Sequence, residues 1–282
     1  MAAKTILISG ATSGIGQAAA LALAREGHQL VLLARNPDRA NATVKLIAEQ
    51  TGNQQVEVIA CDLASLASVR AAADTFCRRY SRLDVLINNA GGIRRERQLG
   101  SEGLEWTFTV NHLAPLLLVH LLLEPLAAAR ARVIQTVSAG ERSGRIDFDN
   151  LNGERRYRMF AAYCNAKLAE TMTTFVLAEK LREQGVTVNC VHPGVVRTRF
   201  GAGTGWFMQA MNSLVYPFLL SPEKGAQTLV YLATSPEVEG ISGKYWQKCR
   251  VKPSSGRSLD QTTARNLYER SLQLVGLAPD AR

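Results

Sequence analysis

The chain alternates short apolar runs with longer segments in which apolar residues recur at helical spacing. Three β-branched or leucine-rich runs, Thr5–Ser9, Gln29–Ala34 and Val56–Cys61, are typical of buried parallel strands. Further strands are predicted at 84–87, 132–137, 186–191 and near 243–246. Helical patterns separate them, so the sequence predicts an α/β fold: a doubly wound parallel sheet of about seven strands with helices on both faces.

The two longest helical patterns are Leu104–Ala129 and Ala161–Gln184. In the first, Pro115 follows Asn111 by four positions. Proline has no N–H to offer the carbonyl four residues earlier. We therefore expect the carbonyl of Asn111 to be free to hold a water, and the helix to bend there.

One segment, 198–220, combines glycines with large apolar side chains such as Trp206, Phe207 and Met208. It predicts a mobile lid over an apolar pocket, although a packing helix or an oligomer contact would give the same pattern. With its 282 residues, the chain is expected to form a single dinucleotide-binding domain, 1–282.

Composition narrows the classes of partner. The net charge is +9, but the basic residues are scattered, which disfavours nucleic acid. Leu113–Leu126 is apolar yet short and interrupted by polar residues, so no membrane span is expected. The N-terminus shows no signal peptide, and the five cysteines show no disulfide or metal-site spacing. These features predict a cytoplasmic protein without a bound metal.

A glycine-rich turn follows the first predicted strand. Gly10, Gly14 and Gly16 precede an Ala/Leu-rich helix. Glycines let the backbone approach a pyrophosphate, and a helix N-terminus offers unpaired N–H groups. The turn therefore predicts dinucleotide binding, although a tight turn without a ligand would look similar.

The end of the second predicted strand favours NADP over NAD. An acidic residue there would accept a bond from the ribose 2′-hydroxyl of NAD, whereas arginine accommodates a 2′-phosphate. Here the position is Arg35, with Arg39 one turn further on. The alternative is a solvated arginine. After the third strand, Asp62 is suited either to the adenine ring or to capping the next helix.

Candidate proton-transfer groups come from the second half of the chain. Tyr163 and Lys167 are four residues apart on a predicted helix, so they share a face. A neighbouring ammonium group favours phenolate. Ser138 ends the fifth predicted strand, and His192 ends the sixth. His192 is interpreted as a loop or core histidine, because nothing nearby in the sequence pairs with it.

Taken together, these motifs resemble the short-chain dehydrogenase/reductase family, whose Rossmann-type fold they imply from Lys4 to about Leu277. Within the family, the retinol dehydrogenase-like branch is most similar, from stretches such as Asp147–Leu151 and Val191–Thr198. The matching motifs are Gly10-x-x-x-Gly14-x-Gly16, Asp62, Asn88-Asn89-Ala90-Gly91, Asn111, Ser138, Tyr163-x-x-x-Lys167, and Pro193-Gly194 with Thr198.

The resemblance implies a role for each matching residue. Tyr163 would exchange a proton with the substrate, Ser138 would bind the substrate oxygen, and Lys167 would lower the pKa of Tyr163 and bind the nicotinamide ribose. Asn111 would hold a water of a proton relay. The cofactor-binding residues expected are Ser9, Gly10, Thr12, Ser13, Gly14, Ile15, Gly16, Arg35, Arg39, Asp62, Leu63, Asn89, Ala90, Gly91, Tyr163, Lys167, Pro193, Gly194, Val195 and Thr198.

The expected function is NADP(H)-dependent hydride transfer to or from an apolar carbonyl or alcohol. The family's usual threonine before the first glycine is Ser9, and Ser13 replaces a basic residue found in some NADP-dependent members. A catalytically silent NADP-binding regulator or scaffold is the alternative. Family members often pair through the two long helices, so a homodimer or homotetramer is compatible with the sequence.

Overall fold

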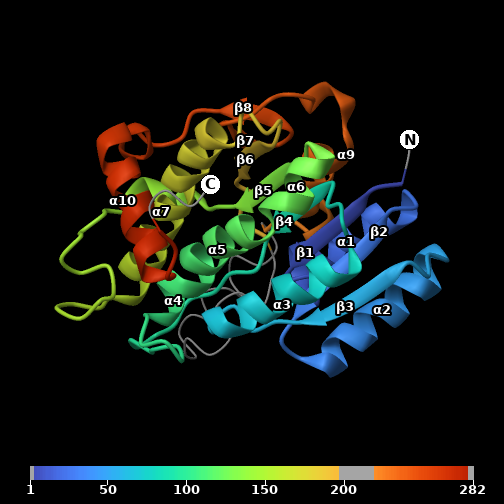
Figure 1. Cartoon of the computed structure of the whole chain (residues 1–282), viewed down its shortest axis with the longest axis horizontal. Helices are drawn as coiled ribbons and strands as arrows, with labels where there is room; N and C mark the ends of the chain where they lie inside the picture. The colour runs from blue at the N-terminus through green and yellow to red at the C-terminus, as the bar shows by residue number, and fades with distance from the viewer. Residues whose placement is uncertain (1–2, 197–218, 279–282) are drawn as a thin grey trace.

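A twisted sheet of eight strands forms the centre of the protein (Figure 1). The structure is a computed structural model that describes residues 3–196 and 219–278. The strand order is β3-β2-β1-β4-β5-β6-β7-β8. The strands are β1 (Thr5–Ser9), β2 (Gln29–Ala34), β3 (Val56–Ala60), β4 (Val85–Asn88), β5 (Arg132–Thr136), β6 (Thr187–Val191), β7 (Tyr245–Gln247) and β8 (Arg250–Lys252).

The predicted parallel sheet is confirmed, with one strand more than expected. β8 pairs antiparallel to β7 at the edge, where it is exposed along its length. A three-residue exposed strand has no apolar run, so hydrophobic patterning gave no sign of it. All other pairings are parallel.

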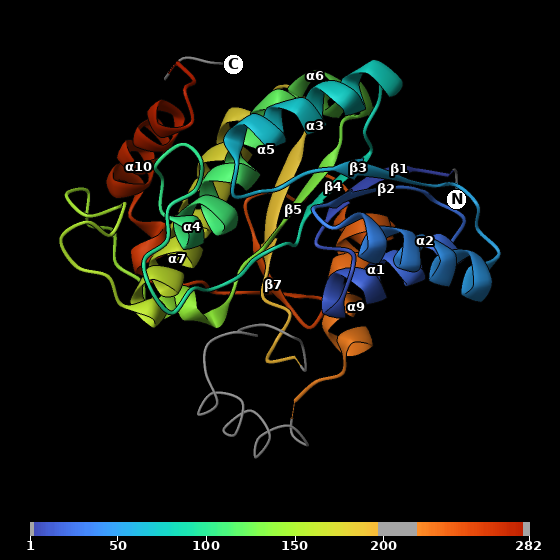
Figure 2. The same cartoon turned by 90° about the horizontal axis from the view of Figure 1, so that it is seen from below.

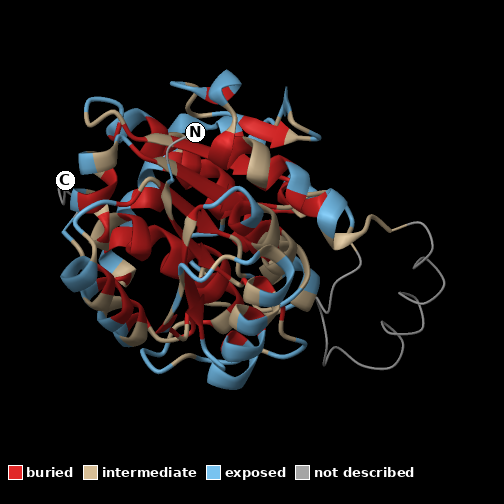
Figure 3. Ribbon diagram, turned by 90° about the vertical axis from the view of Figure 1, so that its right-hand side faces the viewer, coloured by how far each residue is buried: buried red, intermediate tan, exposed pale blue. Residues whose placement is uncertain are grey.

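Helices cover both faces of the sheet (Figure 2). On one face lie α1 (Gly14–Arg25), α2 (Pro37–Thr51) and α9 (Pro222–Thr234), and on the other lie α3 (Leu66–Arg79), α5 (Ala114–Leu121), α6 (Leu123–Ala129) and α7 (Met159–Lys180). Each side has its own apolar core, and the central strands between them are buried (Figure 3). Short helices are α4 (Trp106–Phe108), η2 (Ala139–Ser143), η4 (Pro236–Val238) and η5 (Arg257–Leu259).

The predicted helix 104–129 is divided. Between α4 and α5 the backbone forms a π-helical turn, η1 (Thr109–Leu113), which ends two residues before Pro115. A bend of 66°, which the sequence did not predict, lies at Leu122 between α5 and α6. Among the described helices, none is by itself long and apolar enough to cross a membrane, and only this bent pair meets the length and composition criteria when taken together.

The last helix, α10 (Gln261–Leu274), packs against α7 and contacts the short helix η5 that precedes it in the chain. Tyr268 hydrogen-bonds the ring of His120 on α5 at 3.0 Å. Ser271 hydrogen-bonds the ring of His112 on η1 at 2.8 Å. The last helix is therefore joined to α5 and η1 by hydrogen bonds and to α7 by packing.

Candidate functional site

A cleft of about 820 Å³ opens at the carboxyl edge of the parallel strands. In parallel sheets these strand ends meet at one edge, where ligands of open α/β folds bind. Every predicted site residue in the described part of the chain borders this cleft, except Ser9 and Asn111, which lie immediately behind its wall. Thr198 and the predicted lid, apart from its last two residues, lie outside the described residues.

The glycine-rich turn has the close backbone packing that its sequence predicted. Gly10 has φ +72°, and a Cβ on Gly16 would lie 2.3 Å from the carbonyl oxygen of Gly10. Ser13 precedes α1, and its side chain accepts no hydrogen bond from the helix. By contrast, Asn36 caps α2 and Ser65 caps α3 through their side chains. The N–H groups that begin α1 thus face the cleft with no side-chain cap, as phosphate binding requires.

Ser9 and Asn89 join the first and fourth strands beneath this turn. The Ser9 hydroxyl accepts hydrogen bonds from the backbone N–H of Asn89 and of Ala90, each at 3.1 Å. The Asn89 amide donates to the Ser9 carbonyl at 3.2 Å. The serine that replaces threonine therefore keeps a bonded hydroxyl, and the Asn89 amide ties two strand ends together.

Arg35 and Arg39 border the far end of the cleft, where β2 ends, and Asp62 and Leu63 border it where β3 ends. The Asp62 carboxylate accepts a hydrogen bond from the backbone N–H of Ala64 at 3.0 Å. Ser65, not Asp62, caps α3, so the capping alternative for Asp62 is wrong. Asp62 is thereby fixed at the edge of the cleft.

Ser138 and Tyr163 meet at the middle of the cleft. A hydrogen bond joins the two side chains, and Ser138 also accepts from the N–H of Gly140 at 3.2 Å. Burial raises the pKa of Tyr163 above its usual value of 10.0, while Lys167 and the Ser138 bond act in the opposite direction. Lys167 thus favours phenolate as predicted, but desolvation outweighs it, and the phenol is protonated near neutral pH.

Lys167 is buried and held by two acceptors. Its Nζ donates to the carbonyl oxygen of Thr136 at 2.7 Å and to the Glu170 carboxylate at 2.8 Å. Glu170 was missed in the sequence, although an acidic residue seven positions after Tyr163 on one helix lies on the same stripe. Burial raises the pKa of Glu170 to about 7, and Lys167 acts against that rise.

Asn111 acts in this structure through its side chain. Its amide donates to the carbonyl oxygens of Gly92 and Thr107, at 2.7 and 2.6 Å. Its Oδ1 accepts from the N–H of Gly92 at 3.1 Å. These bonds fasten the turn after β4 to η1. They were not predicted, because sequence gives no sign of which loop a buried amide will meet.

Further lining residues were not singled out in the sequence. Ile93, Trp106 and Val110 form an apolar wall, and Arg94 lies over the Trp106 ring at 3.6 Å. Pro193, Gly194 and Val195 border the cleft as predicted. His192 borders it too, and burial lowers its pKa. Trp106 and Val110 lie four positions apart on adjoining helical turns, whereas Ile93 comes from the preceding loop, so no single motif indicated the wall.

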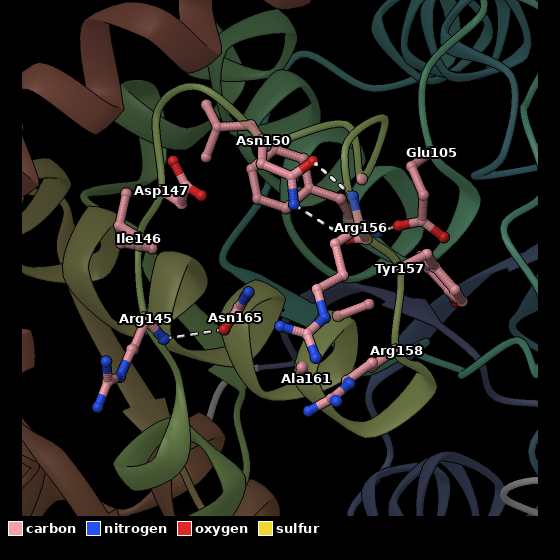
Figure 4. Close-up of a pocket in the computed structure, with 14 residues that line it drawn as sticks. Glu105, Arg145, Ile146, Asp147, Asn150, Arg156, Tyr157, Arg158, Ala161 and Asn165 are labelled. Atoms are coloured by element: carbon pink, nitrogen blue, oxygen red, sulfur yellow. Dashed lines mark hydrogen bonds between the residues drawn. The ribbon is translucent and has the colours of Figure 1, made fainter.

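A second cavity lies beside the irregular segment 145–158 and measures only about 50 Å³ (Figure 4). Asn150 organises this segment: its amide donates to the carbonyl of Arg156 at 2.9 Å. The backbone N–H of Arg145 donates to Asn165 at 2.8 Å. Room for about one or two waters excludes an organic substrate here, so the large cleft is the candidate active site.

Comparison with known proteins agrees with this geometry. The family model for short chain dehydrogenase matches residues 4–205. Retinol dehydrogenase 13 of Homo sapiens is 40% identical over 99% of this chain and 87% of its own length. A Streptomyces protein described as a daunorubicin C-13 ketoreductase is 42% identical over 97% of this chain and 93% of its own.

Solved structures are also similar. An uncharacterized protein from Mycobacterium paratuberculosis has a TM-score of 0.78 at 28% identity, with 98% of this chain and 94% of that chain covered. A protein from Shigella flexneri, described as a short chain dehydrogenase and complexed with NADP, has a TM-score of 0.69 at 25% identity, covering 88% and 97%. The chain therefore belongs to the short-chain dehydrogenase/reductase family and to its retinol dehydrogenase-like branch.

Proposed function

We propose that this protein is an NADP(H)-dependent oxidoreductase acting on an apolar carbonyl or alcohol. The observation that carries the proposal is one continuous cleft that joins the glycine-rich turn, Arg35, and the set of Ser138, Tyr163 and Lys167. The NADP complex of the related Shigella protein supports the cofactor. The wall of Ile93, Trp106 and Val110 supports an apolar substrate.

The residues present fit a nicotinamide dinucleotide phosphate. The uncapped start of α1 and the glycines at 10, 14 and 16 would receive the pyrophosphate. Arg35 and Arg39 would receive the 2′-phosphate. Asp62 and Leu63 would border the adenine, while Pro193 to Val195 would border the nicotinamide. When bound, this cofactor supplies or accepts the hydride.

The chain's own residues manage one proton. Ser138 hydrogen-bonds the substrate oxygen and orients the carbonyl beside Tyr163. Tyr163 is protonated at neutral pH, so in reduction it donates its proton to that oxygen, and in oxidation its phenolate removes a proton. Lys167, fixed by Thr136, supplies the positive charge that stabilises the phenolate. Asn111 holds the turn that borders this site.

The test is a binding titration of NADPH against NADH, followed by NADPH oxidation with small polar and long apolar carbonyls. We expect tighter binding of NADPH and faster turnover of apolar carbonyls. Tyr163→Phe should still bind NADPH but lose about 10²- to 10⁴-fold in kcat/KM. Equal activity of Tyr163→Phe and the parent would instead favour the catalytically silent NADP-binding regulator. Preference for NADH would overturn the cofactor assignment.

We also propose a cytoplasmic location. All five cysteines are free thiols, a state that a reducing compartment maintains. Cell fractionation with immunodetection tests this, and recovery with membranes after a high-salt wash would contradict it.

A further inference from the structure

Tyr163, Lys167 and Glu170 form one stripe along α7. Their spacings of four and three residues place them one above another on the same helical face. Lys167 and Glu170 are joined at 2.8 Å, and their side chains are only 5% and 4% exposed. The ion pair therefore lies in the protein interior, where electrostatic effects on neighbouring groups are little screened by salt.

Lys167 is the cation that faces Glu170. Cys190 on β6 also faces this carboxylate, and burial raises the pKa of its thiol. His112 on η1 faces Lys167, and burial lowers the pKa of His112 to about 3. Both groups are consequently neutral near pH 7. Glu141 on η2 also acts on Cys190, and its carboxylate is held by Ser255.

The carboxylate of Glu170 opposes the effect of Lys167 on Tyr163. A nearby ammonium stabilises the phenolate, whereas a nearby carboxylate destabilises it. Both effects operate in this structure: Lys167 lowers the pKa of Tyr163, and Glu170 raises it. Above the pKa of Glu170, which burial raises to about 7, both partners are charged and the pair is neutral overall, so Tyr163 then experiences only part of the ammonium's field.

We propose that Glu170 is a positioning residue that holds Lys167 in place and extends to higher pH the range in which Tyr163 stays protonated, the form that reduces a carbonyl. The inference rests on the proposed function and adds that the site favours carbonyl reduction over alcohol oxidation. In reduction the O–H bond of Tyr163 breaks and a new O–H bond forms on the substrate oxygen. The nicotinamide cofactor is the reductant that supplies the hydride to the carbonyl carbon.

The direct test is a pH titration of Tyr163 in cofactor-free protein. The absorbance of phenolate is measured as the pH rises. Subtracting the titration of a Tyr163→Phe protein made in the same background isolates this one tyrosine. Glu170→Gln removes the carboxylate's charge, so the Tyr163 midpoint should fall by about one pH unit. Glu170→Asp retains the charge and should stay near the parent.

The same shift should appear in turnover. Reduction requires the protonated phenol, so kcat/KM for carbonyl reduction falls as pH rises through its pKa. In Glu170→Gln this alkaline decline should move to lower pH, while the acidic limb of alcohol oxidation moves to lower pH by a similar amount.

Glu179→Gln is the matched control. Glu179 lies on the same helix with a side chain 63% exposed and pairs with Arg265 at 3.3 Å. It should leave the Tyr163 midpoint unchanged. If Glu170→Gln does not fold, as judged by thermal unfolding, Glu170→Met provides an uncharged side chain of similar length.

The two proposals fail differently. An unchanged Tyr163 midpoint in a folded, uncharged Glu170 variant overturns the role of Glu170, whatever the activity. A parent protein that shows no NADPH-dependent turnover, with the Tyr163 midpoint still shifted in the variant, overturns the proposed function instead.

Discussion

Arg35 and Asp62 face each other across the ends of β2 and β3, with a guanidinium nitrogen 3.9 Å from a carboxylate oxygen. Both side chains are largely exposed, at 63% and 40%. An exposed pair at this distance contributes little to stability. Arg35 is therefore available for a phosphate at the edge of the cleft.

Arg35→Ala should weaken NADPH binding and leave NADH binding nearly unchanged. Hydrogen bonds to charged groups contribute about 1.5–3 kcal/mol, which corresponds to about 10- to 100-fold in Kd. Fluorescence titration of both cofactors measures this. Arg78→Ala on α3, an exposed arginine that bonds Thr75, is the control. An equal loss for NADPH and NADH would show that Arg35 does not read the 2′-phosphate.

Gly16→Ala should disrupt cofactor binding. The added Cβ would lie 2.3 Å from the Gly10 carbonyl oxygen and 2.5 Å from the Asn89 amide nitrogen, so the turn must shift. Overpacking of this kind costs about 1–3 kcal/mol. We expect a lower Tm and at least about tenfold weaker NADPH binding. Gly256→Ala is the control, because its added Cβ meets no atom within 4 Å and the variant should match the parent. Unchanged Tm and NADPH binding in Gly16→Ala would contradict the close packing of the turn.

Asn111→Ala should destabilise the fold by about 2–4 kcal/mol, because it leaves the buried carbonyl of Thr107 and the partly buried N–H of Gly92 without their side-chain partner. Urea unfolding measures the loss. Asn152→Ala removes a side chain with three hydrogen bonds that is more exposed, and should cost less. A larger loss in the control would remove the special role assigned to Asn111.

Stability should fall as the pH drops below about 6.5. Burial lowers the pKa of His112 to about 3 and that of His120 to about 4. Both histidines stay neutral in the folded protein but take up protons in the unfolded chain below about pH 6.5. Their contribution to the free energy of unfolding is therefore complete above the pKa of the unfolded state and is lost as the pH falls toward the pKa of the folded state. Together, the two histidines should contribute about 2–4 kcal/mol to the difference in unfolding free energy between pH 8 and pH 5, as measured by urea unfolding. Glu170, whose pKa burial raises to about 7, acts against part of this difference. His120→Gln should reduce this difference between the two pH values. An unchanged difference would show that His120 does not contribute to the pH dependence of stability.

The protein should be monomeric in solution. Pairing through α5 and α7 requires their outer faces, whereas α10 packs against α7 and hydrogen-bonds His120 of α5 through Tyr268. Light scattering over a range of concentrations measures the mass. A dimer that persists on dilution would show either that another surface pairs or that α10 can leave α7.

The site residues lie far apart along the chain, yet their strand-end and loop positions could be predicted. A parallel sheet brings its carboxyl ends to one edge, so Gly10, Arg35, Asp62 and Ser138 must converge whatever the loops do. The i, i+4 rule likewise placed Tyr163 and Lys167 on one face of α7. Local patterns therefore determined the sheet, the turn and the helix that carries the phenol.

Only the tertiary structure decided the partners of the buried polar groups. Glu170 could have faced solvent or Lys167, and the Asn111 side chain could have met a loop other than the one after β4. Burial selected among these, because a polar group removed from water must find a partner wherever packing brings one. The same holds for β8 and for the position of the 66° bend at Leu122, since edge pairing and helix packing depend on contacts distant in sequence.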